Sequence, residues 1–195
     1  MPTELQPFSA ERMIAAVEAV HRRTIRAAQA LTAAGIPYAV AGGNAVAAWV
    51  ARVDRAAVRN TQDVDILIRR SDFAIARRTL ESHGFCHQLL FGVDCFLDSP
   101  DASPRDAVHI LFAGEKVKSS DLLPNAEITE REATEAYDIL QLESLVRMKL
   151  NSYRLKDRVH LLDMISVGLI DQTWPARFHP ELSIRLQELL DNPDA

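Results

Sequence analysis

Residues 63–68, Asp-Val-Asp-Ile-Leu-Ile, restrict the possible folds of this chain more than any other segment. Alternating acidic and apolar residues with an apolar tail are typical of a β-strand that enters a hydrophobic core. Side chains two residues apart on a strand point to the same face, so Asp63 and Asp65 are expected to project side by side. Two adjacent carboxylates without a basic partner repel each other, which raises a pKa unless a cation neutralises them.

Two interpretations of this carboxylate pair remain open. Mg²⁺ suits it, because the ion binds a few carboxylate oxygens and leaves room for substrate phosphates. Paired carboxylates are also the usual anchors of two-metal sites that transfer phosphoryl or nucleotidyl groups. Alternatively, both aspartates are solvated at the edge of a sheet, where charged side chains prevent aggregation.

A second motif lies upstream, where a short apolar segment over 36–41 ends at Gly42-Gly43 and residues 44–53 return to helix-forming composition. Adjacent glycines between a strand and a helix let the backbone approach a ligand closely. The helix N-terminus that follows offers free amides to a phosphate. A glycine pair alone is a weak signal, because most such pairs merely form the turn.

The two motifs together resemble those of the DNA polymerase β-type nucleotidyltransferase superfamily. The matching residues are Gly42-Gly43-Asn44 between strand and helix, followed by Arg59-x-Thr61-x-Asp63-x-Asp65. The chain looks most like the small bacterial branch that contains the abortive-infection nucleotidyltransferase toxins. In that branch a later helix is rich in Lys and Arg, ends in Lys-Asp and is followed by a further Asp. The corresponding residues here are Lys149, Arg154, Lys156-Asp157 and Asp163, so the similarity extends over about 36–163.

The resemblance implies an α/β (α+β) fold, with a mixed sheet flanked by helices and a helical C-terminal part. It also implies Mg²⁺-dependent transfer of a nucleoside monophosphate from an NTP to an RNA end, a protein or a small molecule. Asp63 and Asp65 would hold the metals of a two-metal site. The nucleotide-binding residues would be Gly42, Gly43, Asn44, Arg59, Thr61, Lys149 and Lys156.

The superfamily usually carries a third carboxylate on a neighbouring strand, and this chain departs from that pattern. The best candidate strand is 107–113, Ala-Val-His-Ile-Leu-Phe-Ala, where the aligned residue is His109. A histidine there could act as a general base near neutral pH, bind a metal, or only form a structural hydrogen bond. The missing acid favours an alternative: a catalytically lapsed nucleotide-binding module, or a toxin–antitoxin-type partner protein of the same fold.

The segment 147–158 is basic and contains Arg147, Lys149, Arg154, Lys156 and Arg158. On one continuous helix, Arg147, Arg154 and Arg158 would share a face. Lys149 or Lys156 could then reach the triphosphate, or the surface could hold an RNA end. The alternative is a solvated helix face whose cations pair with Asp157 and Asp163.

The remaining segments predict an N-terminal helix over 10–34 capped by Ser9, a helix over 72–83 capped by Ser71, and two short strands within 85–97. An irregular excursion over 116–134 precedes helices at 141–150, 156–165 and 181–190. We therefore expect a nucleotidyltransferase core over 1–140 and a helical C-terminal segment over 141–195 that packs on the core.

Composition excludes several classes of protein. The 195 residues include 22 Lys and Arg against 27 Asp and Glu, and the net charge of −5 argues against coating nucleic acid by bulk charge. No apolar run approaches the ~20 residues of a membrane span. The set His83, Cys86, His87 and Cys95 lacks the spacing of a zinc finger, and two cysteines allow at most one disulfide. We expect a cytoplasmic protein that does not bind membranes.

Overall fold

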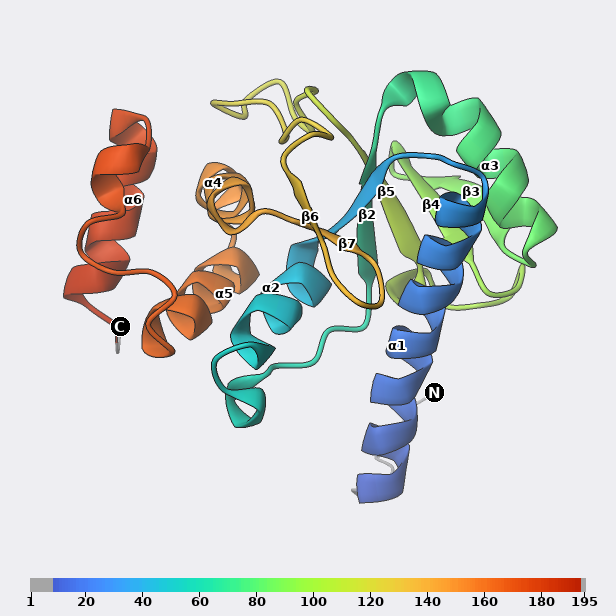
Figure 1. Ribbon diagram of the computed structural model, residues 1–195, viewed down its shortest axis with the longest axis horizontal. Coiled ribbons are helices and arrows are strands. Elements are labelled where there is room, and N and C mark those ends of the chain that lie inside the picture. Colours follow the sequence, from blue (N-terminus) through green and yellow to red (C-terminus); the bar gives the residue numbers. More distant parts are fainter. Residues whose placement is uncertain (1–8, 194–195) are drawn as a thin grey trace, which may run out of the picture.

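The computed structural model describes residues 9–193, which form a seven-stranded mixed sheet with helices on both faces (Figure 1). The strand order is β3-β4-β5-β2-β1-β7-β6. Strand β2 runs parallel to β5 and antiparallel to β1, and β1 runs parallel to β7. The strands are β1 (Tyr38–Ala41), β2 (Val64–Ile68), β3 (Cys86–Leu90), β4 (Val93–Leu97), β5 (Val108–Phe112), β6 (Arg131–Ala133) and β7 (Asp138–Leu140). This architecture confirms the expected mixed α/β fold.

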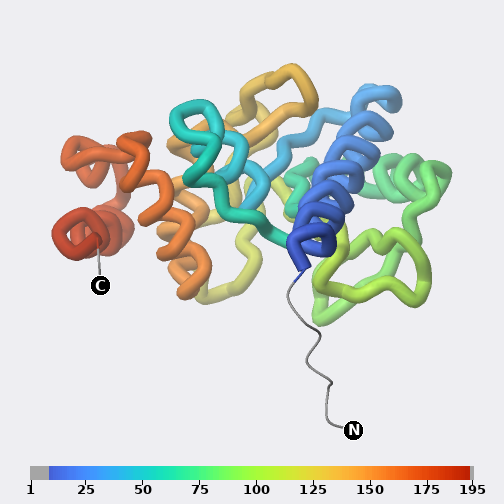
Figure 2. The backbone as a smooth tube through the Cα atoms, turned by 90° about the horizontal axis from the view of Figure 1, so that it is seen from below, coloured from blue at the N-terminus to red at the C-terminus, as the bar shows by residue number. Residues whose placement is uncertain are grey.

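The helices divide between the two faces of the sheet. They are α1 (Ala10–Ala33), α2 (Gly42–Ala51), α3 (Phe73–Ser82), α4 (Leu142–Ser152), α5 (Leu155–Ser166) and α6 (Pro180–Asp191). Helices α1 and α3 cover one face in one hydrophobic core, whereas α2, α4, α5 and α6 build a second core on the other face. Figures 1 and 2 agree that α3 and α6 lie at opposite ends of the molecule.

Strand β2 supplies side chains to both cores, as its alternating sequence requires. Val64, Ile66 and Ile68 are buried against α1 and α3. Leu67 points to the opposite face, towards the core of α2, α4 and α5. Asp65 shares that second face, so the pleat of β2 places its carboxylate on the side where α2 begins.

Several local predictions are confirmed. Helix α1 begins at Ala10, and the Ser9 hydroxyl accepts a hydrogen bond from the backbone N–H of Arg12. Strands β3 and β4 form the expected hairpin, and β5 occupies the predicted strand at 107–113. The apolar residues of α5 and the segment after it belong to the core around α4 and α6, together with Trp174 and Phe178.

One prediction about local structure is wrong, and one hairpin was not predicted. Ser71 lies in a 3₁₀ turn over 70–72, and α3 starts after Asp72 without a side-chain cap. The hairpin of β6 and β7 was not predicted, because these three-residue strands are held by pairing with β1 at Val40–Ile139. The two helices predicted at 141–150 and 156–165 are confirmed as α4 and α5, and Tyr153 with φ 46° separates them, so the basic segment does not form one continuous helix. Arg147 and Arg154 therefore do not share a helix face.

Cys86 and Cys95 are unpaired thiols. In the part of the chain that the structure describes, no helix combines the length and the apolar character needed to cross a bilayer.

Candidate active site

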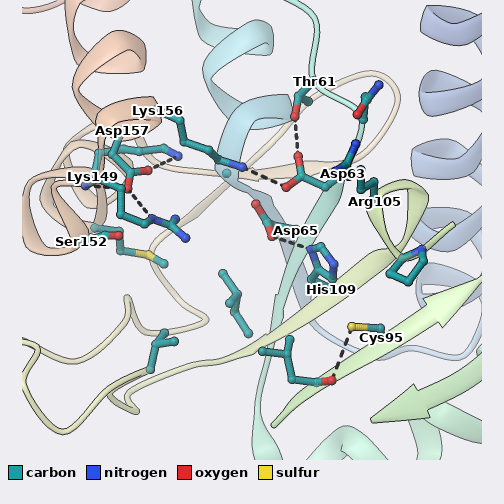
Figure 3. Close-up of a pocket in the computed structure, with 18 of the residues that line it drawn as sticks. Thr61, Asp63, Asp65, Cys95, Arg105, His109, Lys149, Ser152, Lys156 and Asp157 are labelled. Atoms are coloured by element: carbon teal, nitrogen blue, oxygen red, sulfur yellow. Dashed lines mark hydrogen bonds and ion pairs between the residues drawn. The ribbon is translucent and has the colours of Figure 1, made fainter. Parts of the chain in front are cut away.

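The predicted carboxylate pair lies where three strands meet (Figure 3). Asp65 on β2 pairs in register with Ala41 of β1 on one side and with His109 of β5 on the other. Its Oδ1 lies 3.5 Å from His109 Nδ1. One ligand atom each from Asp63, Asp65 and His109 lie within 4.8 Å of one another, and residues 9–193 contain no other such group of His, Cys, Asp or Glu. The structure thus brings together the three residues expected to carry catalysis.

Gly42 and Gly43, the first two residues of α2, each lie so close to a side chain of this site that a Cβ would not fit. Gly42 has φ +58°, and a Cβ there would lie 1.8 Å from Asp65 Oδ2. A Cβ on Gly43 would lie 2.9 Å from the Cβ of Thr61. Helix α2 also starts without a side-chain cap. No side chain therefore occupies the N-terminal amides of α2, which is a condition for binding a phosphate there.

Asp63 precedes β2 and has partners for both of its oxygens. The Thr61 hydroxyl donates to Oδ1, and Lys156 Nζ donates to Oδ2 at 2.9 Å. Burial opposes ionisation of Asp63, but the hydrogen bonds from Thr61 and Lys156 outweigh it and lower the pKa to about 2. The carboxylate is therefore ionised at neutral pH and is held in a fixed orientation.

His109 is the cationic partner of Asp65. Hydrogen bonds with Asp65 and Cys95 outweigh the burial of the imidazole and raise its pKa to about 10. The ring is therefore protonated at neutral pH in this arrangement. Each of the two aspartates thus has a protein cation beside it, in contrast to the unpaired carboxylates that the sequence suggested.

The basic residues around the start of α5 belong to two groups. Lys149 is buried, and its Nζ donates to Asp157 Oδ1 at 3.0 Å. Arg154 donates to Asp157 Oδ2 from its Nε at 2.9 Å and from its backbone N–H at 3.2 Å. Burial opposes ionisation of Asp157, but the charges and hydrogen bonds of Lys149 and Arg154 lower its pKa to about 2. Of the two predicted lysines, only Lys156 bonds to the carboxylate pair.

Two predicted nucleotide-binding residues make other contacts. Asn44 Nδ2 donates to the backbone carbonyl of Asp63 at 2.8 Å, so Asn44 braces the segment that carries the carboxylates. Arg59 Nε donates to Asp163 Oδ1 at 2.7 Å, which joins the segment before β2 to α5. Neither side chain is among the residues that line the cleft.

The site occupies the middle of a cleft of about 980 Å³. Lys149, Arg154 and Lys156 line one end. The opposite end is lined by α1, by the β3–β4 hairpin and by Arg105. Sequence reasoning missed this second end, because its parts are far apart in the chain and share no motif. The alternative in which Asp157 pairs with the cations of this segment is confirmed, but the pair is buried and not solvated as expected.

The donor set fits a divalent cation. Carboxylate oxygens suit Mg²⁺ and Mn²⁺, whereas His109 would have to lose its proton before its imidazole could bind a metal. The absence of a Cβ on Gly42 leaves the Asp65 carboxylate close to the backbone of the turn. Asp63 and Asp65 would hold such an ion.

Solved structures of nucleotidyltransferases and related proteins share this fold. An antigenic nucleotidyltransferase-like protein from Paracoccidioides brasiliensis is 20% identical, with a TM-score of 0.61 over 90% of this chain and 88% of that one. The antibiotic-resistance factor ANT(2'')-Ia is 11% identical, with a TM-score of 0.52 over 94% of both chains. JHP933 from Helicobacter pylori is 14% identical, with a TM-score of 0.52 over 96% of this chain and 78% of that one. No family model and no curated protein matches the sequence. These likenesses confirm the nucleotidyltransferase-like fold.

Proposed function

We propose that this chain is a Mg²⁺-dependent nucleotidyltransferase that transfers a nucleoside monophosphate from an NTP to a hydroxyl acceptor. The observation that carries the proposal is the group of Asp63, Asp65 and His109, whose ligand atoms lie within 4.8 Å in the middle of a cleft. The nucleotidyltransferase-like fold supports it, as does the glycine turn against Asp65.

Different residues of the cleft have different roles in this reaction. Lys156 and Arg154 supply positive charge for the triphosphate at their end of the cleft, and the amides after Gly42 add hydrogen-bond donors. When bound, Mg²⁺ neutralises the carboxylates and the phosphate charge. The acceptor oxygen bonds to the α-phosphorus, the bond from that phosphorus to the β-phosphate oxygen breaks, and pyrophosphate leaves with the electron pair. The hydroxyl proton passes to the Asp65 carboxylate, because His109 is already protonated.

Calorimetric titration with each of the four NTPs, with and without Mg²⁺, tests this proposal. We expect Mg²⁺-dependent binding of at least one NTP, and a loss of about 100-fold or more in affinity in Asp63→Asn and Asp65→Asn. Asp121→Asn is the matched control, because Asp121 lines the same cleft outside the carboxylate group. Unchanged binding in both aspartate variants, or the same loss in the control, would contradict the assignment.

One observation favours a second candidate, a catalytically lapsed nucleotide-binding module. Lys156 neutralises Asp63 and His109 neutralises Asp65, so the protein's own cations already balance the pair. Such a module would bind an NTP equally well without Mg²⁺ and would release no pyrophosphate with any acceptor. A place in the abortive-infection branch, or in a toxin–antitoxin pair, stays a prediction from the sequence motifs.

A further inference from the structure

The two ends of the cleft differ in chemistry. The end beyond His109 is apolar, and the side chains that form it are Met13, Val17, Val20, Leu90, Phe91, Val93 and Pro104. Of the described residues at this end of the cleft, Arg105 alone is charged, and no Asp or Glu is among them. The cationic end is suited to the triphosphate, which leaves the apolar end for the second substrate.

The tip of the β3–β4 hairpin has a conformation that folding alone does not explain. Phe91 and Gly92 connect the strands with φ values of 51° and 80°, the signature of a type I′ turn. That turn favours Asn at its first position, and a bulky residue at positive φ is strained. The Phe91 side chain is fully exposed, so no packing offsets the strain. Strain without a structural benefit is typical of functional positions.

The exposed part of α1 points to the same surface. Met13 and Val17 are largely exposed apolar residues on the first half of this helix, and both line the cleft. Figures 1 and 2 show this half of α1 extending beyond the sheet. Exposed apolar side chains that continue into a cleft mark a binding surface for an apolar group.

The charges at the apolar end of the cleft restrict which class of ligand can bind there. A polyamine would need carboxylates beside it, and a nucleic acid backbone would need several cations, because its phosphates dominate its affinity for proteins. Arg105 provides a single positive charge, and the rest of the wall is apolar. An uncharged apolar molecule is the ligand that this composition matches.

We propose that the acceptor is an uncharged alcohol whose apolar body binds between α1 and the β3–β4 hairpin. This inference rests on the proposed function, because it identifies the hydroxyl compound that the transfer requires. The alcohol oxygen bonds to the α-phosphorus, pyrophosphate leaves with the electron pair of the broken bond, and the proton passes to the Asp65 carboxylate. The product is a phosphodiester between the alcohol and the nucleoside.

Binding of primary alcohols from ethanol to 1-octanol, measured by calorimetry without NTP, tests the apolar site independently of turnover. Each added methylene should raise the affinity about threefold to fourfold until the site is filled. A terminal amine should weaken binding, so 8-amino-1-octanol is the matched charged compound. Pyrophosphate release with NTP and Mg²⁺ is then measured with the same series, and KM should fall in parallel with the dissociation constant.

Two variants and two controls locate the site. Met13→Ser and Phe91→Asn should each lower the affinity for 1-octanol about tenfold. Ile14→Ser and Leu89→Ser remove other exposed apolar residues, 59% and 65% exposed, from the same helix and hairpin, but outside the cleft lining. These controls should bind as the wild type does. Asparagine suits the type I′ turn, so Phe91→Asn should lose binding without losing thermal stability.

The possible failures are distinguishable. Affinity that is independent of chain length, equal losses in the two controls, or tighter binding of the amino alcohol would overturn the apolar acceptor site. Graded binding that depends on Met13 and Phe91, but with no pyrophosphate release for any alcohol, would support the apolar site and overturn the proposed transfer function instead.

Discussion

Two acidic centres of this molecule each contain an aspartate paired with a lysine, but they differ in burial. Asp63 and Asp157 each bind a lysine, and each has a pKa lowered to about 2. The side chain of Asp157 is 1% exposed and that of its partner Lys149 is 6% exposed. The side chains of Asp63 and Lys156 are 21% and 47% exposed. A buried pair is held together because separation would leave an uncompensated charge, whereas a solvated pair can exchange its partner. We therefore assign Asp157 to structure and Asp63 to ligand binding.

The largest expected effect separates these two roles. Asp157→Asn leaves Lys149 as a buried unpaired cation, so the free energy of unfolding should fall by about 3–5 kcal/mol. Asp63→Asn should lower it less, by about 1–2 kcal/mol, since Lys156 is half-exposed and water can solvate its ammonium. Urea denaturation of both variants measures the difference. Equal losses would remove the distinction between the two centres.

The pH dependence of stability sharpens the same comparison. The folded pKa of Asp157 is about 2, below the ordinary value of 3.8, so the unfolded chain binds a proton more readily. The stabilisation is therefore complete above about pH 4 and is lost as the pH falls towards 2. The difference in unfolding free energy between the wild type and Asp157→Asn should shrink by about 2 kcal/mol between pH 5 and pH 2. A difference that stays constant from pH 5 to pH 2 would contradict the lowered pKa of Asp157.

The glycine turn gives a test at the exposed centre. Gly42→Ala forces a Cβ to within 1.8 Å of Asp65 Oδ2 in addition to straining a positive φ, so Mg²⁺-dependent NTP affinity should fall at least about tenfold. Gly35→Ala is the control, because Gly35 has φ +67° but no atom within 4 Å of the added Cβ. It should cost about 1 kcal/mol of stability and leave NTP affinity unchanged. If the two variants bind NTP alike, the close approach has no role in binding.

The smallest change in stability is expected for Lys156→Met. Its ammonium is half-exposed, so the free energy of unfolding should change by no more than about 0.5–1 kcal/mol. NTP affinity should fall several-fold and become less sensitive to salt, because one cation is lost from the phosphate end. Fluorescence titration with NTP at two salt concentrations measures both the affinity and its dependence on salt. An unaltered salt dependence would remove Lys156 from the phosphate end.

Predictions from the sequence succeeded where the determining interactions are local. The alternation at 64–68 and the turn at Phe91-Gly92 lie within single segments, and both appear in the structure as strands and a hairpin. The break between the helices predicted at 141–150 and 156–165 is also local, and it occurs at Tyr153, which adopts a left-handed conformation. Strands β6 and β7 were not predicted, because β7 depends on pairing with β1, a contact across about half of the chain, and β6 pairs with β7.

The same distinction between local and long-range interactions applies to the candidate site. Asp63, Asp65 and His109 were predicted to lie together from strand periodicity and from the resemblance to known motifs. Their partners were not, since Lys156 reaches Asp63 across 93 residues and Arg59 reaches Asp163 across 104 residues. Sequence spacing carries no information about such pairs. The roles of all these residues stay predictions until binding and turnover are measured.

The position of β2 between β1 and β5 makes the site tolerant of substitutions but intolerant of length changes. Inserting or deleting one residue before Asp65 would turn its carboxylate into the core of α1 and α3 and move Val64 or Ile66 towards the cleft. Catalytic geometry and folding would then be lost together. Point substitutions of the acidic residues can therefore abolish the chemistry while the chain remains folded. Small insertions, in contrast, cannot move the acidic pair along the strand without disrupting the fold.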